Sequence, residues 1–213
     1  MIRFLNSFVK ITAWLPQKFV FKFQYFYEDK KVQSRKIKGP AIIISNHTAV
    51  FDYAGFLFVF FGRTLRYQMA EVLFKKKGLG VFLKAMGGIY VDRDGKNFSF
   101  INESLKILNK GGVVGIFPES RIPLPDEEKP LPFKTSLGYL AINADVPVIP
   151  VYTNGNYFNN KHARVVIGKP LKVEDYYNPE LTEKENIQLF TDACRNKIIE
   201  LGKMMESIEN EKK

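Results

Sequence analysis

Short apolar runs that alternate with helical patterns constrain the fold of this 213-residue chain most strongly. Residues 41–45 (Ala-Ile-Ile-Ile-Ser) are mostly β-branched, which is typical of a central strand buried on both faces. Further strands are predicted at 65–70, 89–91, 113–117, 146–152 and 163–167, and helices at 52–62, 79–87, 97–109, 134–144 and 182–209. This alternation predicts an α/β domain with a mostly parallel central sheet flanked by helices.

The N-terminal 38 residues differ from the rest and predict a separate segment ahead of a domain at 39–213. Nine lysines or arginines and two acidic residues lie within residues 1–40, so +7 of the net charge of +10 is there. On a helical wheel, phenylalanines and leucines gather opposite a polar face that includes Asn6, Lys10 and Lys18. Pro16 is suited to begin a helix, so two amphipathic helices are predicted, at 2–15 and 16–27.

A basic amphipathic pair of helices is typical of a segment that lies on an anionic membrane surface. The alternative is an ordinary helix that covers the core of its own domain. No uncharged apolar run reaches the roughly 20 residues that span a bilayer, and lysines interrupt any signal-peptide core. We therefore expect a peripheral or monotopic protein at the cytoplasmic face of the cell membrane.

The net charge and the numbers of histidines and cysteines indicate which kinds of ligand or partner the chain could bind. The net charge of +10 fits nucleic acid or anionic lipid. The positive charge is concentrated in an aromatic amphipathic segment and no nucleic-acid-binding signature is present, so we expect no nucleic-acid partner. Two histidines and one cysteine show no zinc-ligand spacing, and we expect no metal. Cys194 lies in a helical pattern, which indicates a packed side chain rather than a nucleophile.

The sequence Asn46-His47-Thr48-Ala49-Val50-Phe51-Asp52 follows the first apolar strand. A strand-to-helix turn can bring His47 and Asp52 together, so that the carboxylate holds one ring nitrogen protonated and leaves the other as a base. No neighbouring serine or cysteine resembles an activated nucleophile. The pair therefore suits deprotonation of a substrate hydroxyl, and His47 and Asp52 are the predicted catalytic residues.

Two more polar clusters follow predicted strands. Gly88-Ile89-Tyr90-Val91-Asp92-Arg93 places an arginine after one strand, and Phe117-Pro118-Glu119-Ser120-Arg121 places a glutamate and an arginine after another. Sites in such folds gather at the carboxyl ends of strands. Two arginines in one cleft match a phosphate monoester, and Glu119 either accepts from a hydroxyl or holds an arginine. Surface ion pairs are the alternative for each residue.

These motifs resemble those of the lysophosphatidic acid acyltransferases, within the wider glycerolipid acyltransferases. The resemblance covers about residues 40–170. N-H-x-x-x-x-D matches Asn46, His47 and Asp52, and G-x-I-x-x-x-R matches Gly88, Ile89 and Arg93. F-P-E-G-x-R matches Phe117, Pro118, Glu119 and, one residue early, Arg121, and V-P-V-I-P-V matches residues 146–151.

The resemblance implies an O-acyltransferase in phospholipid biosynthesis that moves a fatty acyl group from acyl-carrier protein or acyl-CoA to the sn-2 hydroxyl of lysophosphatidic acid. It implies no cofactor beyond this acyl donor. It assigns His47 as base and Asp52 as its orienting partner. Arg93, Glu119, Ser120 and Arg121 are expected to bind the acceptor, Asn46 and Gly88 to support the site, and the fourth motif to shape the acyl pocket.

Two alternatives remain open at this point. Ser120 stands where the family usually has glycine, and Phe133-Lys134-Thr135-Ser136 stands where K-x-G is common. Both differences concern the acceptor, so another lysophospholipid or glycerol 3-phosphate is an alternative substrate. A non-catalytic protein that binds anionic lipid through residues 1–27 is the other alternative, and the His47/Asp52 pair argues against it.

Overall fold

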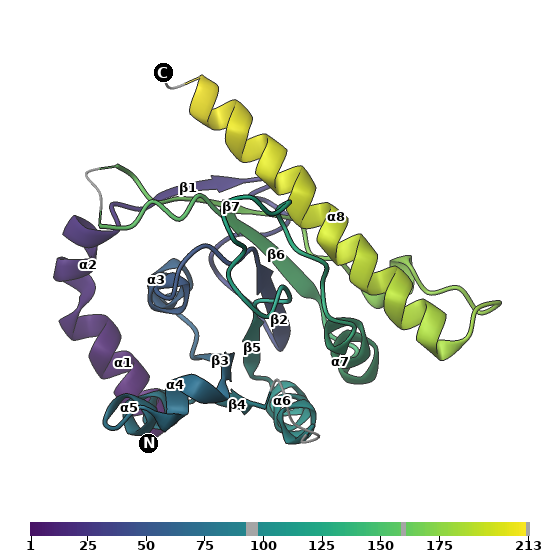
Figure 1. Ribbon diagram of the computed structural model, residues 1–213, viewed down its shortest axis with the longest axis horizontal. Coiled ribbons are helices and arrows are strands. Elements are labelled where there is room, and N and C mark those ends of the chain that lie inside the picture. The colour runs from purple at the N-terminus through teal and green to yellow at the C-terminus, as the bar shows by residue number, and fades with distance from the viewer. Residues whose placement is uncertain (93–97, 159–160, 212–213) are drawn as a thin grey trace.

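A sheet with the strand order β1-β7-β6-β2-β5-β3-β4 forms the centre of the computed structural model, which describes residues 1–92, 98–158 and 161–211 (Figure 1). The five strands from β6 to β4 are parallel, and β7 and β1 run in the opposite direction. The strands are β1 (Gln24–Tyr27), β2 (Ala41–Ser45), β3 (Leu65–Ala70), β4 (Ile89–Val91), β5 (Val113–Ile116), β6 (Val148–Thr153) and β7 (Arg164–Ile167).

Helices cover both faces of the sheet (Figure 1). In β2, Ile42 and Ile44 pack into the core under α6, α7 and α8, whereas Ile43 packs into the core under α3. This alternation of a fully buried strand is why its residues are apolar on both faces. The helices are α1 (Ile2–Thr12), α2 (Trp14–Val20), α3 (Asp52–Val59), α4 (Glu71–Lys75), α5 (Leu79–Met86), α6 (Ser99–Asn109), α7 (Ser136–Ala144) and α8 (Glu183–Asn210), with a 3-10 turn at Val173–Asp175.

The predicted fold class is confirmed, since the sheet is mostly parallel and flanked by helices. Every predicted strand is present within two residues of its predicted ends. The helix predicted at 182–209 is α8, which begins with a capping box formed by Thr182 and Glu185. Its buried residues recur every three to four positions, as expected of a helix with one face on a core.

The prediction of a helix over residues 16–27 is wrong beyond Val20. Residues 24–27 form β1, an edge strand that pairs in parallel with β7, with Gln24 opposite Arg164. The side chains of these two residues are also hydrogen-bonded, Arg164 Nε to Gln24 Oε1 at 3.1 Å. A pairing between residues 140 positions apart leaves no local sequence pattern, so this strand cannot be recognised from its own residues. The division after residue 38 stays a prediction, although β1 on its N-terminal side belongs to the sheet.

The first helix buries two residues of its predicted polar face. Asn6 and Lys10 are 1% and 3% exposed, and they donate hydrogen bonds to the backbone carbonyls of Met86, Phe61 and Arg63. Lys10, which the sequence placed on the polar face, therefore joins α1 to the domain instead of facing outward. The large apolar residues of α1 and α2 remain exposed, among them Phe4, Phe8, Ile11, Leu15 and Phe19.

The structure also bears on membrane topology. No helix in the described ranges has both the length and the apolar character that crossing a bilayer requires.

Candidate active site

The carboxyl ends of β2, β5 and β6 meet at one edge of the sheet. These strands are neighbours and run in parallel, so the residues that follow them converge. His47 follows β2, Glu119 follows β5, and Thr153 ends β6. The structure thus places these residues at the carboxyl ends of parallel strands, where sites gather in such folds.

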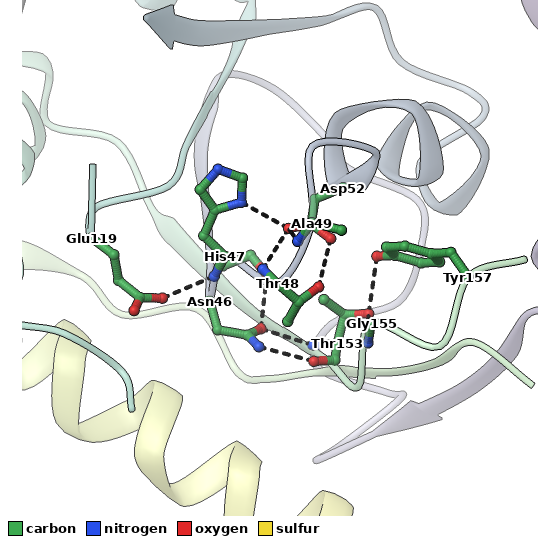
Figure 2. Close-up of polar contacts among 10 residues, drawn as sticks. Asn46, His47, Thr48, Ala49, Asp52, Glu119, Thr153, Gly155 and Tyr157 are labelled. Atoms are coloured by element: carbon green, nitrogen blue, oxygen red, sulfur yellow. Dashed lines mark hydrogen bonds and ion pairs between the residues drawn. The ribbon is translucent and has the colours of Figure 1, made fainter. Parts of the chain in front are cut away.

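His47 and Asp52 form a hydrogen-bonded pair across the turn from β2 to α3 (Figure 2). His47 Nδ1 lies 2.8 Å from Asp52 Oδ2. The Asp52 side chain is fully buried and that of His47 is 20% exposed. A buried carboxylate beside Nδ1 selects the tautomer that carries the proton there, which leaves the Nε2 lone pair available as a base.

Other donors hold the Asp52 carboxylate in place (Figure 2). The backbone N–H groups of Thr48 and Ala49 donate to Oδ2 at 2.7 and 3.0 Å, and the Thr48 hydroxyl donates to Oδ1 at 2.8 Å. The carboxylate is thus compensated although it is removed from water. Its orientation toward the imidazole is set by the turn itself.

The His47 ring is held on a second side by Phe117. The two rings are stacked, with centroids 4.4 Å apart and an interplanar angle of 15°. Phe117 also packs on the buried rings of Tyr67 and Phe56, so the histidine rests on a cluster of aromatic side chains. The hydrogen bond and the stacking together fix both the tautomer and the plane of the base.

Asn46 and Glu119 join the loops around the histidine (Figure 2). Asn46 exchanges two hydrogen bonds of 2.9 Å with the backbone of Thr153, which ties the end of β2 to the end of β6. Glu119 accepts from the N–H of His47 and from that of Leu131, both at 2.8 Å. Burial raises the pKa of Glu119, and the two backbone hydrogen bonds oppose this shift.

A cavity of about 290 Å³ opens beside the histidine. The polar side chains among its lining residues include His47, Glu119 and Lys129. Lys129 was not predicted from the sequence, where it is one charge in a proline-rich loop. The full lining comprises Asn46, His47, Thr48, Glu119, Ile122, Pro123, Lys129, Pro130, Tyr152, Thr153 and Asn154.

The remaining predicted site residues lie elsewhere. Arg121 is absent from the cavity lining and pairs with both carboxylate oxygens of Glu127, at 2.5 and 2.6 Å. Ser120 has a φ of 64°, and its N–H donates to the Phe117 carbonyl. Gly88 packs closely against Leu83, Met69 and Phe74, which is a structural role. Arg93 lies outside the described residues.

Residues that the sequence did not identify complete the site. Thr48 and Thr153 belong to the hydrogen-bonded turn, and Thr153 Oγ1 lies 3.2 Å from the hydroxyl of Tyr157 (Figure 2). Gly155 has a φ of 68°, and a β-carbon there would lie 2.5 Å from Thr48 Oγ1. Only the position of Thr48 inside the His47–Asp52 interval could have drawn attention to it. No metal-binding group of three His, Cys, Asp or Glu side chains is present in the described part of the chain.

Comparisons with known proteins agree with one another. The family model described as Acyltransferase matches residues 24–154, more than half of the chain. The 1-acyl-sn-glycerol-3-phosphate acyltransferase of Bacillus subtilis (strain 168) is 28% identical over 149 residues, covering 68% of this chain and 72% of that protein. The human 1-acyl-sn-glycerol-3-phosphate acyltransferase beta is 28% identical over 170 residues, covering 71% of this chain and 55% of that protein.

The fold has a counterpart among solved structures. It is similar to the crystal structure of the 1-acyl-sn-glycerophosphate (LPA) acyltransferase PlsC from Thermotoga maritima, with a TM-score of 0.59 and 18% sequence identity. The similarity covers 94% of this chain and 79% of the other.

Proposed function

Because the chain belongs to the acyltransferase family, we propose that it transfers a fatty acyl group from an acyl thioester to the sn-2 hydroxyl of lysophosphatidic acid, giving phosphatidic acid. The names of the relatives from Bacillus subtilis and human support this acceptor. The proposed acyl donor is either acyl-carrier protein or acyl-CoA.

One observation carries the proposal: the oriented His47–Asp52 pair beside a cavity. An imidazole whose Nδ1 faces a buried carboxylate presents Nε2 as a general base. The nearby hydroxyl of Thr48 is committed to Asp52, and Cys194 is buried in the core under α8. Direct transfer from donor to acceptor therefore fits the site better than a covalent enzyme intermediate.

In the proposed reaction, Nε2 removes the proton from the acceptor hydroxyl as the oxygen attacks the thioester carbonyl carbon. A tetrahedral oxyanion forms and collapses, and the carbon–sulfur bond breaks. The imidazolium returns its proton to the departing thiolate, so the products are the ester and a free thiol. Asp52 stabilises the imidazolium throughout, since its carboxylate is already hydrogen-bonded to Nδ1.

We place the acceptor headgroup next to Glu119 and Lys129, which line the cavity with His47. Lys129 supplies a positive charge for the phosphate, and Glu119 lies beside the glycerol, whose single free hydroxyl, at sn-2, gives its proton to His47. Arg93, Ser120 and Arg121 remain proposed acceptor contacts. For Arg121 to contact the phosphate, it would have to exchange its bidentate pair with Glu127 for that ligand.

The exposed apolar residues of α1 and α2 support binding at a membrane surface. Phe4 and Phe19 are 76% and 71% exposed. Other residues of α1 pack against the domain: Leu5 and Val9 contact the cluster that contains Leu57 and Phe58. One face of the helix therefore covers the core, and the other is free to enter the headgroup region as a peripheral or monotopic anchor.

Acyl transfer with a panel of acceptors tests this function. Purified protein in detergent micelles is given acyl-CoA or acyl-carrier protein together with lysophosphatidic acid, lysophosphatidylethanolamine or glycerol 3-phosphate. We expect product with lysophosphatidic acid at a kcat/KM at least about tenfold above the other acceptors, because only it combines an acyl chain with a phosphate monoester. Preference for another acceptor would refute the proposed substrate, and no transfer to any acceptor would refute the activity.

A further inference from the structure

A second and larger cavity lies between α2, the start of β1 and the end of α3. Its volume is about 750 Å³, and it shares no lining residue with the cavity beside His47. In Figure 1, α2 lies beside the start of β1, on the side of α3 that faces away from α8. The lining residues are Trp14, Gln17, Lys18, Lys22, Phe23, Gln24, Tyr25, Arg35, Phe58, Phe61 and His162.

The charged side chains that line this cavity are positive. Lys18, Lys22 and Arg35 line it together with His162, and no aspartate or glutamate is among the described residues that line it. Three like charges around one concave surface repel one another unless an anion lies between them. The lining therefore suits an anionic ligand.

Arg35 is held in place without losing its charge. Its Nε and Nη2 donate to the carbonyls of Val59 and Phe58 at 2.7 and 2.9 Å, and its guanidinium lies 3.9 Å from the centroid of the Tyr25 ring. These partners are neutral, so the positive charge is not compensated by any of them. A guanidinium fixed in this way is pre-organised for a phosphate.

The other basic residues of the lining come from two parts of the chain, residues 18–22 and the loop before β7. Lys18 Nζ lies 3.7 Å from the centroid of the Trp14 ring. His162 Nδ1 lies 2.9 Å from the carbonyl oxygen of Lys22, which joins the loop before β7 to the turn before β1. The β1–β7 pairing thus brings Lys22 and His162 together, and Arg35 joins the same lining through its hydrogen bonds to the end of α3.

The apolar lining suits an amphiphile rather than a simple ion. Trp14, Phe23, Phe58 and Phe61 contribute aromatic rings. The cavity also adjoins α2, whose Leu15 and Phe19 belong to the exposed apolar face. A lipid that enters from the membrane would meet the aromatic rings with its glycerol and acyl region and the cations with its phosphate.

We propose that this cavity binds the phosphate headgroup of an anionic phospholipid of the membrane surface, as a site separate from the one that binds the reacting lipid. From the proposed function, the inference takes only the orientation of α1 and α2 at a membrane. Occupancy of the site makes binding to a membrane depend on its anionic lipid content. A soluble phosphate compound is the other source of the same chemistry, and the test distinguishes the two.

Trp14 is the single tryptophan of the chain and lines the cavity, so its fluorescence reports binding directly. The full chain is titrated with dihexanoyl phosphatidylglycerol below its micelle concentration, with dihexanoyl phosphatidylcholine, and with inorganic phosphate. We expect a saturable change in emission with phosphatidylglycerol alone. An equal response to phosphatidylcholine would overturn the anionic site, and an equal affinity for inorganic phosphate would overturn the lipid as its ligand.

A matched pair of charge variants shows whether the cavity, rather than diffuse charge, is responsible. Lys18→Gln/Lys22→Gln removes two cations of the lining, whereas Lys30→Gln/Lys31→Gln removes two exposed cations outside it. We expect affinity for vesicles of equal parts phosphatidylcholine and phosphatidylglycerol to fall about thirtyfold in the first variant, with a much smaller loss in the second. Equal losses would refute the site.

The acyltransferase reaction in micelles provides an independent readout. The first variant is expected to keep the activity of the wild type there, because neither substituted lysine lines the cavity beside His47. Loss of lipid binding with intact acyl transfer supports the second site. Unchanged lipid binding refutes it, whether or not the protein transfers acyl groups.

Discussion

At the scale of single residues, the chemistry depends on which nitrogen of His47 carries the proton. Asp52 decides this, since its buried carboxylate accepts from Nδ1 and from the backbone of the same turn. Asn46 and Glu119 act one step further away by joining the loops on either side. The base is therefore positioned before any substrate binds.

Asp52→Asn tests this assignment. The asparagine amide would donate to Nδ1, so the ring proton would move to Nε2 and the histidine could no longer accept a proton from substrate. We expect kcat to fall about a thousandfold or more, while the KM for the acceptor changes little. Thermal unfolding of the variant serves as control. A loss of less than tenfold in a folded variant would contradict the proposed role.

Ser120 shows where a local departure from the family pattern has a structural cost. Its φ of 64° lies in the left-handed region, which glycine adopts without strain. We predict that Ser120→Gly is more stable than Ser120→Ala by about 1 kcal/mol, because only the glycine removes the unfavourable contact of the β-carbon. Chemical denaturation of both variants measures the difference, and the opposite order of stability would contradict this reading.

At the scale of elements, α1 is joined to the domain by its polar side chains. Lys10 is the central contact, and burial lowers its pKa from 10.5 to about 8. In the unfolded chain a lysine keeps its ordinary pKa, so between about pH 8 and 10.5 the unfolded state binds the additional proton. Raising the pH through this window therefore favours the folded state.

Lys10→Met isolates this effect, because methionine fills a similar volume without a titratable group. We predict that the melting temperature of the wild type rises relative to that of Lys10→Met as the pH goes from 8 to 10.5. Other titrating groups are common to both proteins and cancel in the difference. Melting curves that shift in parallel across this range would show that Lys10 is not titrating in the buried position.

Helices and strands could be predicted where neighbouring residues carry the sequence pattern, and could not where a distant part of the chain decides the structure. The run at residues 41–45 and the spacing in α8 identify a buried strand and an amphipathic helix without further information. Residues 24–27 are aromatic and polar in a pattern that also fits a helix, and only the partner strand β7 decides between the two. The burial of two polar residues of α1 likewise depends on carbonyls at Phe61, Arg63 and Met86 that no local pattern identifies.

In the candidate site, too, the features with a local sequence pattern could be predicted and the others could not. His47, Asp52 and Glu119 could be predicted because each belongs to a motif at the end of a strand, and parallel strands bring such ends together. Two other features depend on loop conformations and could not be predicted from the sequence. They are the hydrogen bonds that Glu119 accepts from the His47 and Leu131 backbones, and the pairing of Arg121 with Glu127. The position of Lys129 in the cavity lining also depends on a loop conformation and could not be predicted.

At the scale of the whole molecule, the exposed apolar face of α1 and α2 is the proposed membrane contact. Phe8→Ser/Phe19→Ser is predicted to reduce binding to phospholipid vesicles at least about a hundredfold, since burying each phenylalanine contributes about 2 kcal/mol. Vesicle co-sedimentation measures the loss. Phe98→Ser, at another exposed phenylalanine, is the control and is expected to bind as the wild type does.

These variants also separate anchoring from chemistry. The double variant is expected to lose activity toward an acceptor embedded in vesicles and to keep activity in detergent micelles, where no bilayer has to be reached. Vesicle binding that matches the wild type would contradict the proposed orientation of α1 and α2. Loss of activity in both settings would show instead that these residues contribute to the fold or to the reaction.

The most direct test of the central claim is the rate of acyl transfer to lysophosphatidic acid by His47→Ala in detergent micelles, compared with the wild type. If His47 is the base, the wild type forms phosphatidic acid, and kcat of the variant falls about a thousandfold or more while its melting temperature shows that it is folded. Equal rates in the two proteins would contradict the assignment of His47 and with it the proposed mechanism.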